Sequence, residues 1–153
     1  MSINKIDRPI EQRNTGKGVP NAVIHVGRPL NKRQERILEA LPGYDSCVVL
    51  RKNDVNMKDL SALTAFTGDE FALFTKGKER LVIRGDHNSV NVTKERADSL
   101  SAEGYKWSGH THPGIGLNCL QASPGDKEIL NSFKQKVAYI YNSQGDHLEF
   151  WKE

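Results

Sequence analysis

The chain contains the stretch Gly109-His110-Thr111-His112-Pro113, which is followed after a short connection by Ser123-Pro124-Gly125-Asp126. On a β-strand, residues i and i+2 point to the same face, so the imidazoles of His110 and His112 can converge on one ion. Asp126 follows within reach of a short loop. Two imidazoles, one carboxylate and a position left open for water are the ligands of catalytic zinc. A metal-dependent hydrolase is therefore the first hypothesis.

The residues around this pattern predict a strand over 105–112, which ends at the His pair, and a helix over 123–135. Ser123 suits the N-cap of that helix, Pro124 its first position and Asp126 its third. Capping alone would explain the serine and the aspartate. The two interpretations are compatible, because a carboxylate in the first turn of a helix can face the end of a neighbouring strand.

The rest of the chain alternates between short apolar runs and helical periods. The predicted helices cover 31–41, 54–68 (with Asp54 as its N-cap) and 93–103, and the further predicted strands cover 23–26, 44–51, 70–74, 80–84, 90–92, 137–142 and 147–151. Residues 69–84 are typical of a hairpin. The sequence thus predicts an α+β fold of the α/β sandwich-like kind, in which helices flank a mixed, largely antiparallel central sheet.

Composition limits the classes of protein that fit. The chain has 153 residues, of which 37% are hydrophobic and 27% charged, with a formal net charge of +3. The length suits a single domain, expected over 23–153. The polar start, broken by Pro9, Gly16, Gly18 and Pro20, predicts a flexible leader or linker over 1–22. No basic stripe with interleaved aromatic residues indicates nucleic acid, and no long apolar segment indicates a membrane. The two cysteines are too few for a disulfide scaffold.

Glu70 is the candidate proton carrier. A metal-dependent hydrolase needs a base that takes a proton from the attacking water and delivers it to the leaving group. Glu70 opens an otherwise apolar strand, where an unpaired buried carboxylate would be costly. It could equally lie on a solvated edge of the sheet. Glu79, on the second arm of the hairpin, is the alternative if the register of the strands differs.

Taken in order, Glu70, then His110-Thr111-His112-Pro113, then Ser123-x-x-Asp126 resemble the JAMM signature of the JAB/MPN metalloprotease superfamily. That signature consists of an upstream glutamate, H-[ST]-H-P, and S-x-x-D after a loop. The order of the predicted elements over about 44–142 also resembles this fold, which has a cytidine deaminase-like architecture.

The resemblance implies a role for each matching residue. His110, His112 and Asp126 would bind Zn²⁺ with water as the fourth ligand, Glu70 would be the general acid/base, and Ser123 would stabilise the oxyanion. Members of the family cleave peptide or isopeptide bonds, often in ubiquitin-like conjugates, which implies a protein substrate. Bacterial members also occur within polymorphic toxins. Two settings follow: a cytoplasmic enzyme, or a toxin domain delivered within a larger protein, whose partner would include an immunity protein.

The chain departs from the family pattern between the second histidine and the serine. The family usually has seven residues there, and this chain has ten, 113–122. Because longer loops add little closure entropy, the glycine-bearing connection is expected to bulge without moving its ends. The added length also places Cys119 near the predicted site, either as a free loop thiol or as a substitute ligand.

Two other functions compete with hydrolysis of peptide bonds. A non-catalytic binding module on the same fold would have lost its metal, so zinc content discriminates it. A different metal-dependent hydrolase is the other: a zinc deaminase would need H-x-E with a later C-x-x-C, which the chain lacks, and a nuclease would need a basic surface.

Overall fold

The computed structural model describes residues 6–7 and 29–152. Within this part the helices are α2 (Lys32–Glu39), α3 (Met57–Thr67), α4 (Lys94–Ala102) and α5 (Pro124–Ser132), with short 3₁₀ turns at Lys52–Asp54 and Asn118–Leu120. The strands are β1 (Ile6–Asp7), β2 (Cys47–Arg51), β3 (Phe71–Lys76), β4 (Glu79–Arg84), β5 (Ser89–Val90), β6 (Lys106–Thr111), β7 (Val137–Tyr141) and β8 (His147–Trp151).

Six strands form the central sheet in the order β2-β4-β3-β6-β7-β8. All neighbours are antiparallel except β6 and β7, which are parallel and are joined through α5. A parallel pair needs such a crossover, because a tight turn can only reverse the chain. The predicted mixed, largely antiparallel sheet flanked by helices is confirmed, as is the hairpin, in which β3 and β4 pair from Phe71–Arg84 to Lys76–Glu79.

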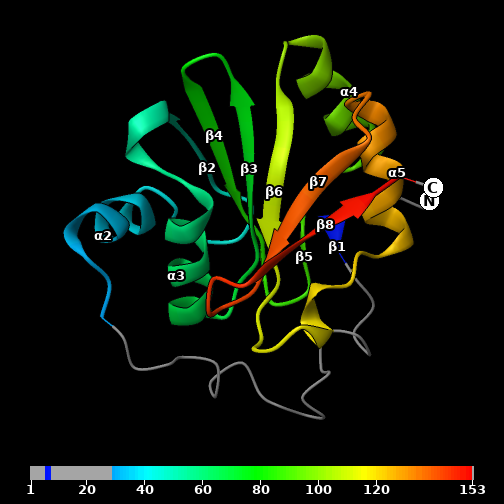
Figure 1. Ribbon diagram of the computed structural model, residues 1–153. Coiled ribbons are helices and arrows are strands. Elements are labelled where there is room, and N and C mark those ends of the chain that lie inside the picture. Colours follow the sequence, from blue (N-terminus) through cyan, green and yellow to red (C-terminus); the bar gives the residue numbers. More distant parts are fainter. Residues whose placement is uncertain (1–5, 8–28, 153) are drawn as a thin grey trace.

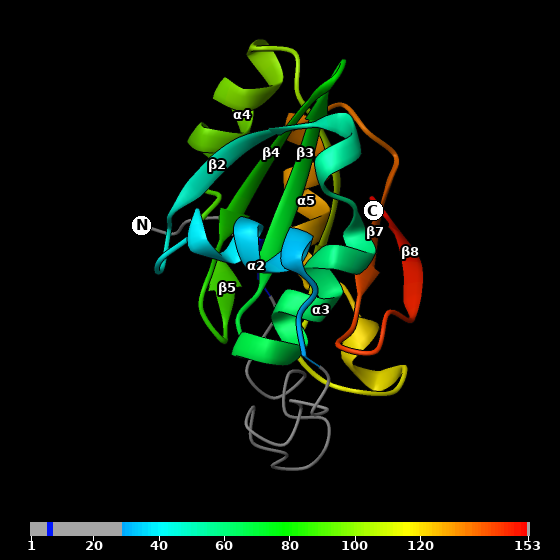
Figure 2. The ribbon, with the colours of Figure 1, turned by 90° about the vertical axis from the view of Figure 1, so that its left-hand side faces the viewer.

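The helices cover the sheet from both sides (Figure 1). In Figure 2, which looks onto the face of the sheet, α2 and α3 lie in front of the sheet while α5 lies behind it. Two apolar cores result: one is built around Leu60, Leu63 and Phe71 under α2 and α3, and the other around Trp107 and Phe133 under α4 and α5. Successive residues of a strand therefore point to different helices, which separates the residues near the His pair into two layers.

Local capping signals explain where the helices begin. Thr93 caps α4 and Ser123 caps α5, as the sequence predicted. The prediction of Asp54 as the cap of α3 is wrong: residues 52–54 form a 3₁₀ turn, and Asn56 is the cap, in a reciprocal capping box with Asp59. Either residue type can cap a helix, but only Asn56 has an acidic side chain three positions later to complete the box.

Two predictions fall largely outside the described residues, namely the leader over 1–22 and the strand over 23–26. The exception is β1, whose residues Ile6–Asp7 pair antiparallel with Ser89–Val90 of β5. In the described part of the chain, none of the helices is both long and apolar enough to cross a membrane.

Candidate metal centre

The sheet brings together residues that lie 40 positions apart in the sequence. His110 sits opposite Ala72 in the antiparallel β3–β6 pair, so the start of β3 and the end of β6 meet at one edge. Glu70 directly precedes β3, and His112 directly follows β6. Three potential ligand atoms lie within 4.8 Å of one another, one each from Glu70, His110 and His112. This buried group could hold a metal ion.

Asp126 reaches the same point from α5. Its Oδ2 lies 3.4 Å from Nε2 of His110 and 3.9 Å from Nε2 of His112. The two Nε2 atoms are 2.9 Å apart. The predicted ligand trio therefore converges, and Glu70 stands beside it as a second carboxylate.

The centre is fully buried and could hold a cation. The side chains of Glu70, His110, His112 and Asp126 are all 0% exposed. Among the described residues, Oδ1 of Asp126 and Nδ1 of His110 have no hydrogen-bond partner. Buried polar atoms are normally satisfied, and an exception needs an explanation such as a bound ion. Burial of the Asp126 carboxylate is costly unless a positive charge compensates it.

Neighbouring groups set the orientation of both imidazoles. The His110 ring stacks on Trp107, with centroids 5.1 Å apart, and meets the edge of Phe150. Nδ1 of His112 lies 2.8 Å from the carbonyl oxygen of Cys119. Because a carbonyl only accepts, Nδ1 carries the proton, and a neutral His112 ring then presents the lone pair of Nε2 to the centre. Metal-ligating histidines are typically oriented in this way.

Cys119 contributes its backbone carbonyl to the orientation of His112. The thiol is buried and lies 3.3 Å from the carbonyl oxygen of Gly116, to which it donates. Sequence reasoning weighed only the thiol, as a free group or a substitute ligand. A carbonyl contact leaves no trace in residue type, so no sequence signal pointed to it.

Ser123 and Asp126 form the reciprocal capping box that their sequence predicted. The Ser123 hydroxyl accepts from the Asp126 amide and the Asp126 Oδ2 accepts from the Ser123 amide, each at 3.0 Å. The cap fixes the carboxylate at the N-terminus of α5, on the side that faces the His pair. Capping and proximity to the imidazoles therefore occur together, as the compatible interpretation required.

The ten-residue connection folds as a compact loop. Gly114 exchanges two hydrogen bonds with Ser143, its amide donating to the hydroxyl at 3.1 Å and its carbonyl accepting from the amide at 2.9 Å. The Asn142 side chain donates to the carbonyl of Gly116 at 2.9 Å. The turn between β7 and β8 thus holds the loop in place. Despite its added length, the loop leads back so that Ser123 and Asp126 lie beside the His pair.

The structure places the two candidate glutamates at opposite ends of the hairpin. The backbone of Glu70 is fixed on both sides, because its amide donates to Asp86 and its carbonyl accepts from the amide of Gly85. Glu79 lies at the opposite end of the β3–β4 hairpin and is exposed. There it accepts a hydrogen bond from the Tyr105 hydroxyl at 2.8 Å. The alternative assignment to Glu79 is therefore wrong, and so is the idea that Glu70 lies on a solvated edge.

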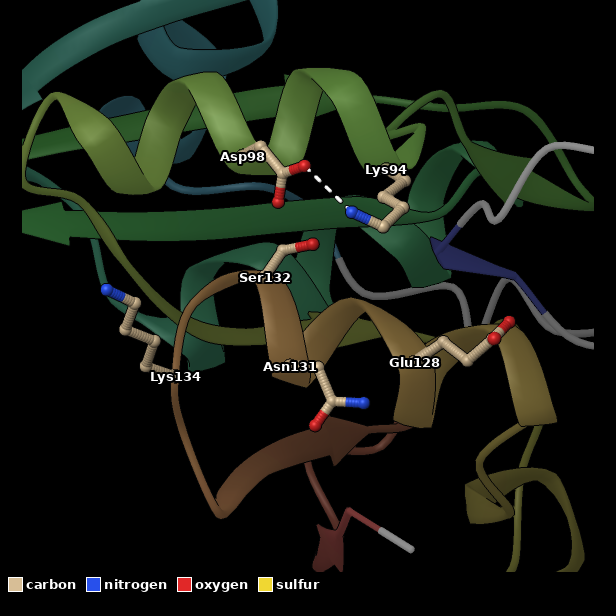
Figure 3. Close-up of a pocket in the computed structure, with 6 residues that line it drawn as sticks. All are labelled: Lys94, Asp98, Glu128, Asn131, Ser132 and Lys134. Atoms are coloured by element: carbon tan, nitrogen blue, oxygen red, sulfur yellow. Dashed lines mark hydrogen bonds and ion pairs between the residues drawn. The ribbon is translucent and has the colours of Figure 1, made fainter.

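Two open cavities lie on the surface of the described part of the chain. One of about 250 Å³ lies between α4 and α5 and is lined by polar side chains (Figure 3). It holds the Lys94–Asp98 ion pair at 2.9 Å, in which the hydrogen bond from Lys94 lowers the pKa of Asp98. A larger hollow of about 530 Å³ lies beside β8, between Leu120–Ala122 and Glu149–Lys152. It adjoins the segment that leads into Ser123.

Comparison of this chain with known protein families, characterised proteins and solved structures finds no match.

Proposed function

We propose that this protein is a zinc-dependent metallopeptidase or isopeptidase of the JAB/MPN type. The observation that supports this most is the convergence of His110, His112 and Asp126 at a buried point, with the Glu70 carboxylate beside it. These residues occur in the order of the JAMM signature. The spacing of the donors and the chemistry of the set both bear on which metal they suit.

The three donor atoms lie near the spacing that a tetrahedral zinc ion requires. Zinc binds imidazole nitrogen and carboxylate oxygen at about 2.0–2.2 Å, so two ligands on a tetrahedron lie about 3.3–3.6 Å apart. The separations here are 2.9, 3.4 and 3.9 Å, so one lies within this range, one about 0.4 Å below it and one about 0.3 Å above it. Two neutral imidazoles and one carboxylate are also a donor set that zinc favours and that Mg²⁺ and Ca²⁺ do not. The residues present therefore fit the ion.

Zinc bound by this trio would supply an acidified water and a Lewis acid for the scissile carbonyl. The protein's own groups do the rest. The Glu70 carboxylate takes the proton of the attacking water and returns it to the leaving amine. The Ser123 hydroxyl, already held at the start of α5, donates toward the oxygen on which negative charge develops. The Cys119 carbonyl keeps His112 in the tautomer that ligation requires.

The proposed substrate is a protein, cleaved at a peptide or isopeptide bond, as in ubiquitin-like conjugates. A toxin domain with an immunity protein as its partner is the proposed setting, along with a cytoplasmic enzyme. Both follow only from the resemblance of the motif, and the hydrolysis assay below tests the reaction class independently of the setting.

Elemental measurement and one substitution test the proposal. We expect one zinc per chain and hydrolysis of isopeptide-linked diubiquitin or of a mixed peptide library. Glu70→Gln should abolish hydrolysis while the unfolding transition and a stoichiometry of one zinc at saturating zinc remain, although loss of the neighbouring negative charge lowers the affinity for the ion. Glu79→Gln removes a carboxylate at the other end of the same hairpin and should leave hydrolysis unchanged. A purified protein that binds no zinc would refute the metal centre, and equal loss in both variants would refute the role of Glu70.

One observation favours a second candidate, a non-catalytic module with a structural metal. All four side chains of the centre are 0% exposed. Structural zinc sites are closed, whereas catalytic sites keep an open position. A structural site would retain zinc against brief chelation and show no hydrolysis, with or without Glu70.

A further inference from the structure

Thr111 lies between the two histidines but faces the other side of the sheet. His110 and His112 point toward α5, whereas the Thr111 hydroxyl points toward α3 and lies 2.5 Å from the hydroxyl of Thr64. Both threonines are 0% exposed. This hydroxyl pair is therefore a buried polar contact behind the metal centre, and the proposed reaction gives it no role.

The same hydroxyl holds the start of β3. The backbone pairing of β3 with β6 ends at Ala72 and His110, so the amide of Phe71 lies just beyond it. That amide donates to Oγ1 of Thr111 at 2.9 Å. A side chain thus takes the hydrogen bond that a ladder partner would otherwise accept.

Together with the Ala72–His110 pairing, this contact joins the Glu70 segment to the strand that carries the His pair. The backbone groups of Glu70 itself bond to Gly85 and Asp86, which belong to the β4–β5 connection. Those two bonds fix Glu70 relative to β4. Thr111, in contrast, binds the amide of Phe71, the residue after Glu70, and itself stands between His110 and His112. The Thr111 hydroxyl is therefore in a place to affect the position of the carboxylate against the imidazoles.

We propose that Thr111, supported by Thr64, is a positioning residue that holds the Glu70 carboxylate against the His110–His112 pair. The inference rests on the metal centre proposed above and deepens it. A valine would fill the same space but would leave the buried Phe71 amide without its acceptor, which is costly. The start of β3 would then shift, and Glu70 with it.

Binding of Co²⁺, a zinc substitute with a visible absorption spectrum, provides the test in a double-mutant cycle. We expect Thr111→Val to weaken Co²⁺ binding about tenfold, which is typical for loss of a group that orients metal-site residues. The absorption spectrum of the bound Co²⁺ should change as well. In the Glu70→Gln background the same substitution should change affinity less than about threefold, because the two residues act as a unit. Thr111→Ser keeps the hydroxyl and should restore both affinity and spectrum.

The chain offers a matched control. Thr75 of β3 and Ser108 of β6 form a second hydroxyl pair, at 2.5 Å. It lies toward the end of the β3–β6 pairing that is farther from the His pair. Thr75→Val should therefore leave Co²⁺ affinity and spectrum unchanged. If Thr111→Val does not fold, Thr64→Val removes the supporting hydroxyl from α3 and should show a weaker coupling of the same sign.

Each outcome has a definite meaning. Equal loss of affinity with and without the Glu70 carboxylate would show that Thr111 acts on the histidines alone and would overturn the inference. Unchanged affinity in Thr111→Val, or an equal loss in Thr75→Val, would overturn it as well. A parent protein that binds no Co²⁺ and no zinc would instead remove the proposed metal centre, and the inference with it.

Discussion

Gly109→Ala tests whether the close approach of β6 and β7 holds the metal centre together. An ideal Cβ at Gly109 would lie 2.6 Å from the carbonyl oxygen of Tyr139 and 3.3 Å from its carbonyl carbon. Ordinary van der Waals contact begins at 3.4 Å, so β7 would have to retreat by about 0.8 Å (3.4 − 2.6). The obstacle is backbone, which cannot rotate away as a side chain can.

The expected cost follows from this overlap. Overpacking of a buried site typically costs 1–3 kcal/mol, and a backbone obstacle places Gly109→Ala at about 2–3 kcal/mol. The retreat also affects the site, because the His112 amide donates to the Tyr141 carbonyl at 2.9 Å in the same strand pair. With an m-value of about 1–3 kcal/mol/M, the urea midpoint should fall by about 1 M, and zinc affinity should fall as well.

Gly43→Ala is the matched control. Nothing lies within 4 Å of a Cβ at Gly43, so alanine meets open space there. The free energy of unfolding of this variant should lie within about 0.5 kcal/mol of the parent's. It could be slightly higher, because alanine reduces the conformational freedom of the unfolded chain. If Gly109→Ala unfolded at the same urea concentration as Gly43→Ala, the claim that β6 and β7 require a glycine at this position would be refuted.

Three further predictions use other parts of the structure. Ser123→Ala should cost about 1 kcal/mol in the metal-free protein and should also weaken zinc binding, whereas Thr93→Ala, which removes the corresponding cap of α4, should cost a similar amount and leave zinc binding unchanged. Burial, followed by the hydrogen bond to Glu79, raises the pKa of Tyr105 to about 12 from 10.0. The neutral phenol is therefore favoured in the folded state. Its contribution to the free energy of unfolding should be complete below pH 10 and be lost as the pH rises toward 12. Absorbance titration of the parent against Tyr105→Phe would measure the raised pKa. Free zinc at a thousand times its Kd should raise the free energy of unfolding by about 4 kcal/mol, and His112→Gln should remove that gain.

The sequence predicted the parts of this fold that depend on near neighbours. The cap of α5 and the β3–β4 hairpin are set within a few residues, and so is the shared face of His110 and His112. The choice between Glu70 and Glu79 could not be made in this way, because it depends on which end of the hairpin meets β6. The contacts of Thr111 were missed for the same reason: its partners, Thr64 and the Phe71 amide, come from elements 40 or more positions away.

The cap of α5 also explains why the longer loop leaves the centre in place. Lengthening a flexible loop from seven to ten residues costs only about 0.3 kcal/mol in closure entropy. The position of the Asp126 carboxylate does not depend on that loop directly, because its hydrogen bond to the Ser123 amide holds it to the first turn of α5. A carboxylate has about four acceptor positions, so the cap leaves room for an ion. Any connection that allows α5 to dock beside β6 therefore delivers the same carboxylate, and the number of residues between His112 and Ser123 is a weak criterion for recognising such a candidate centre.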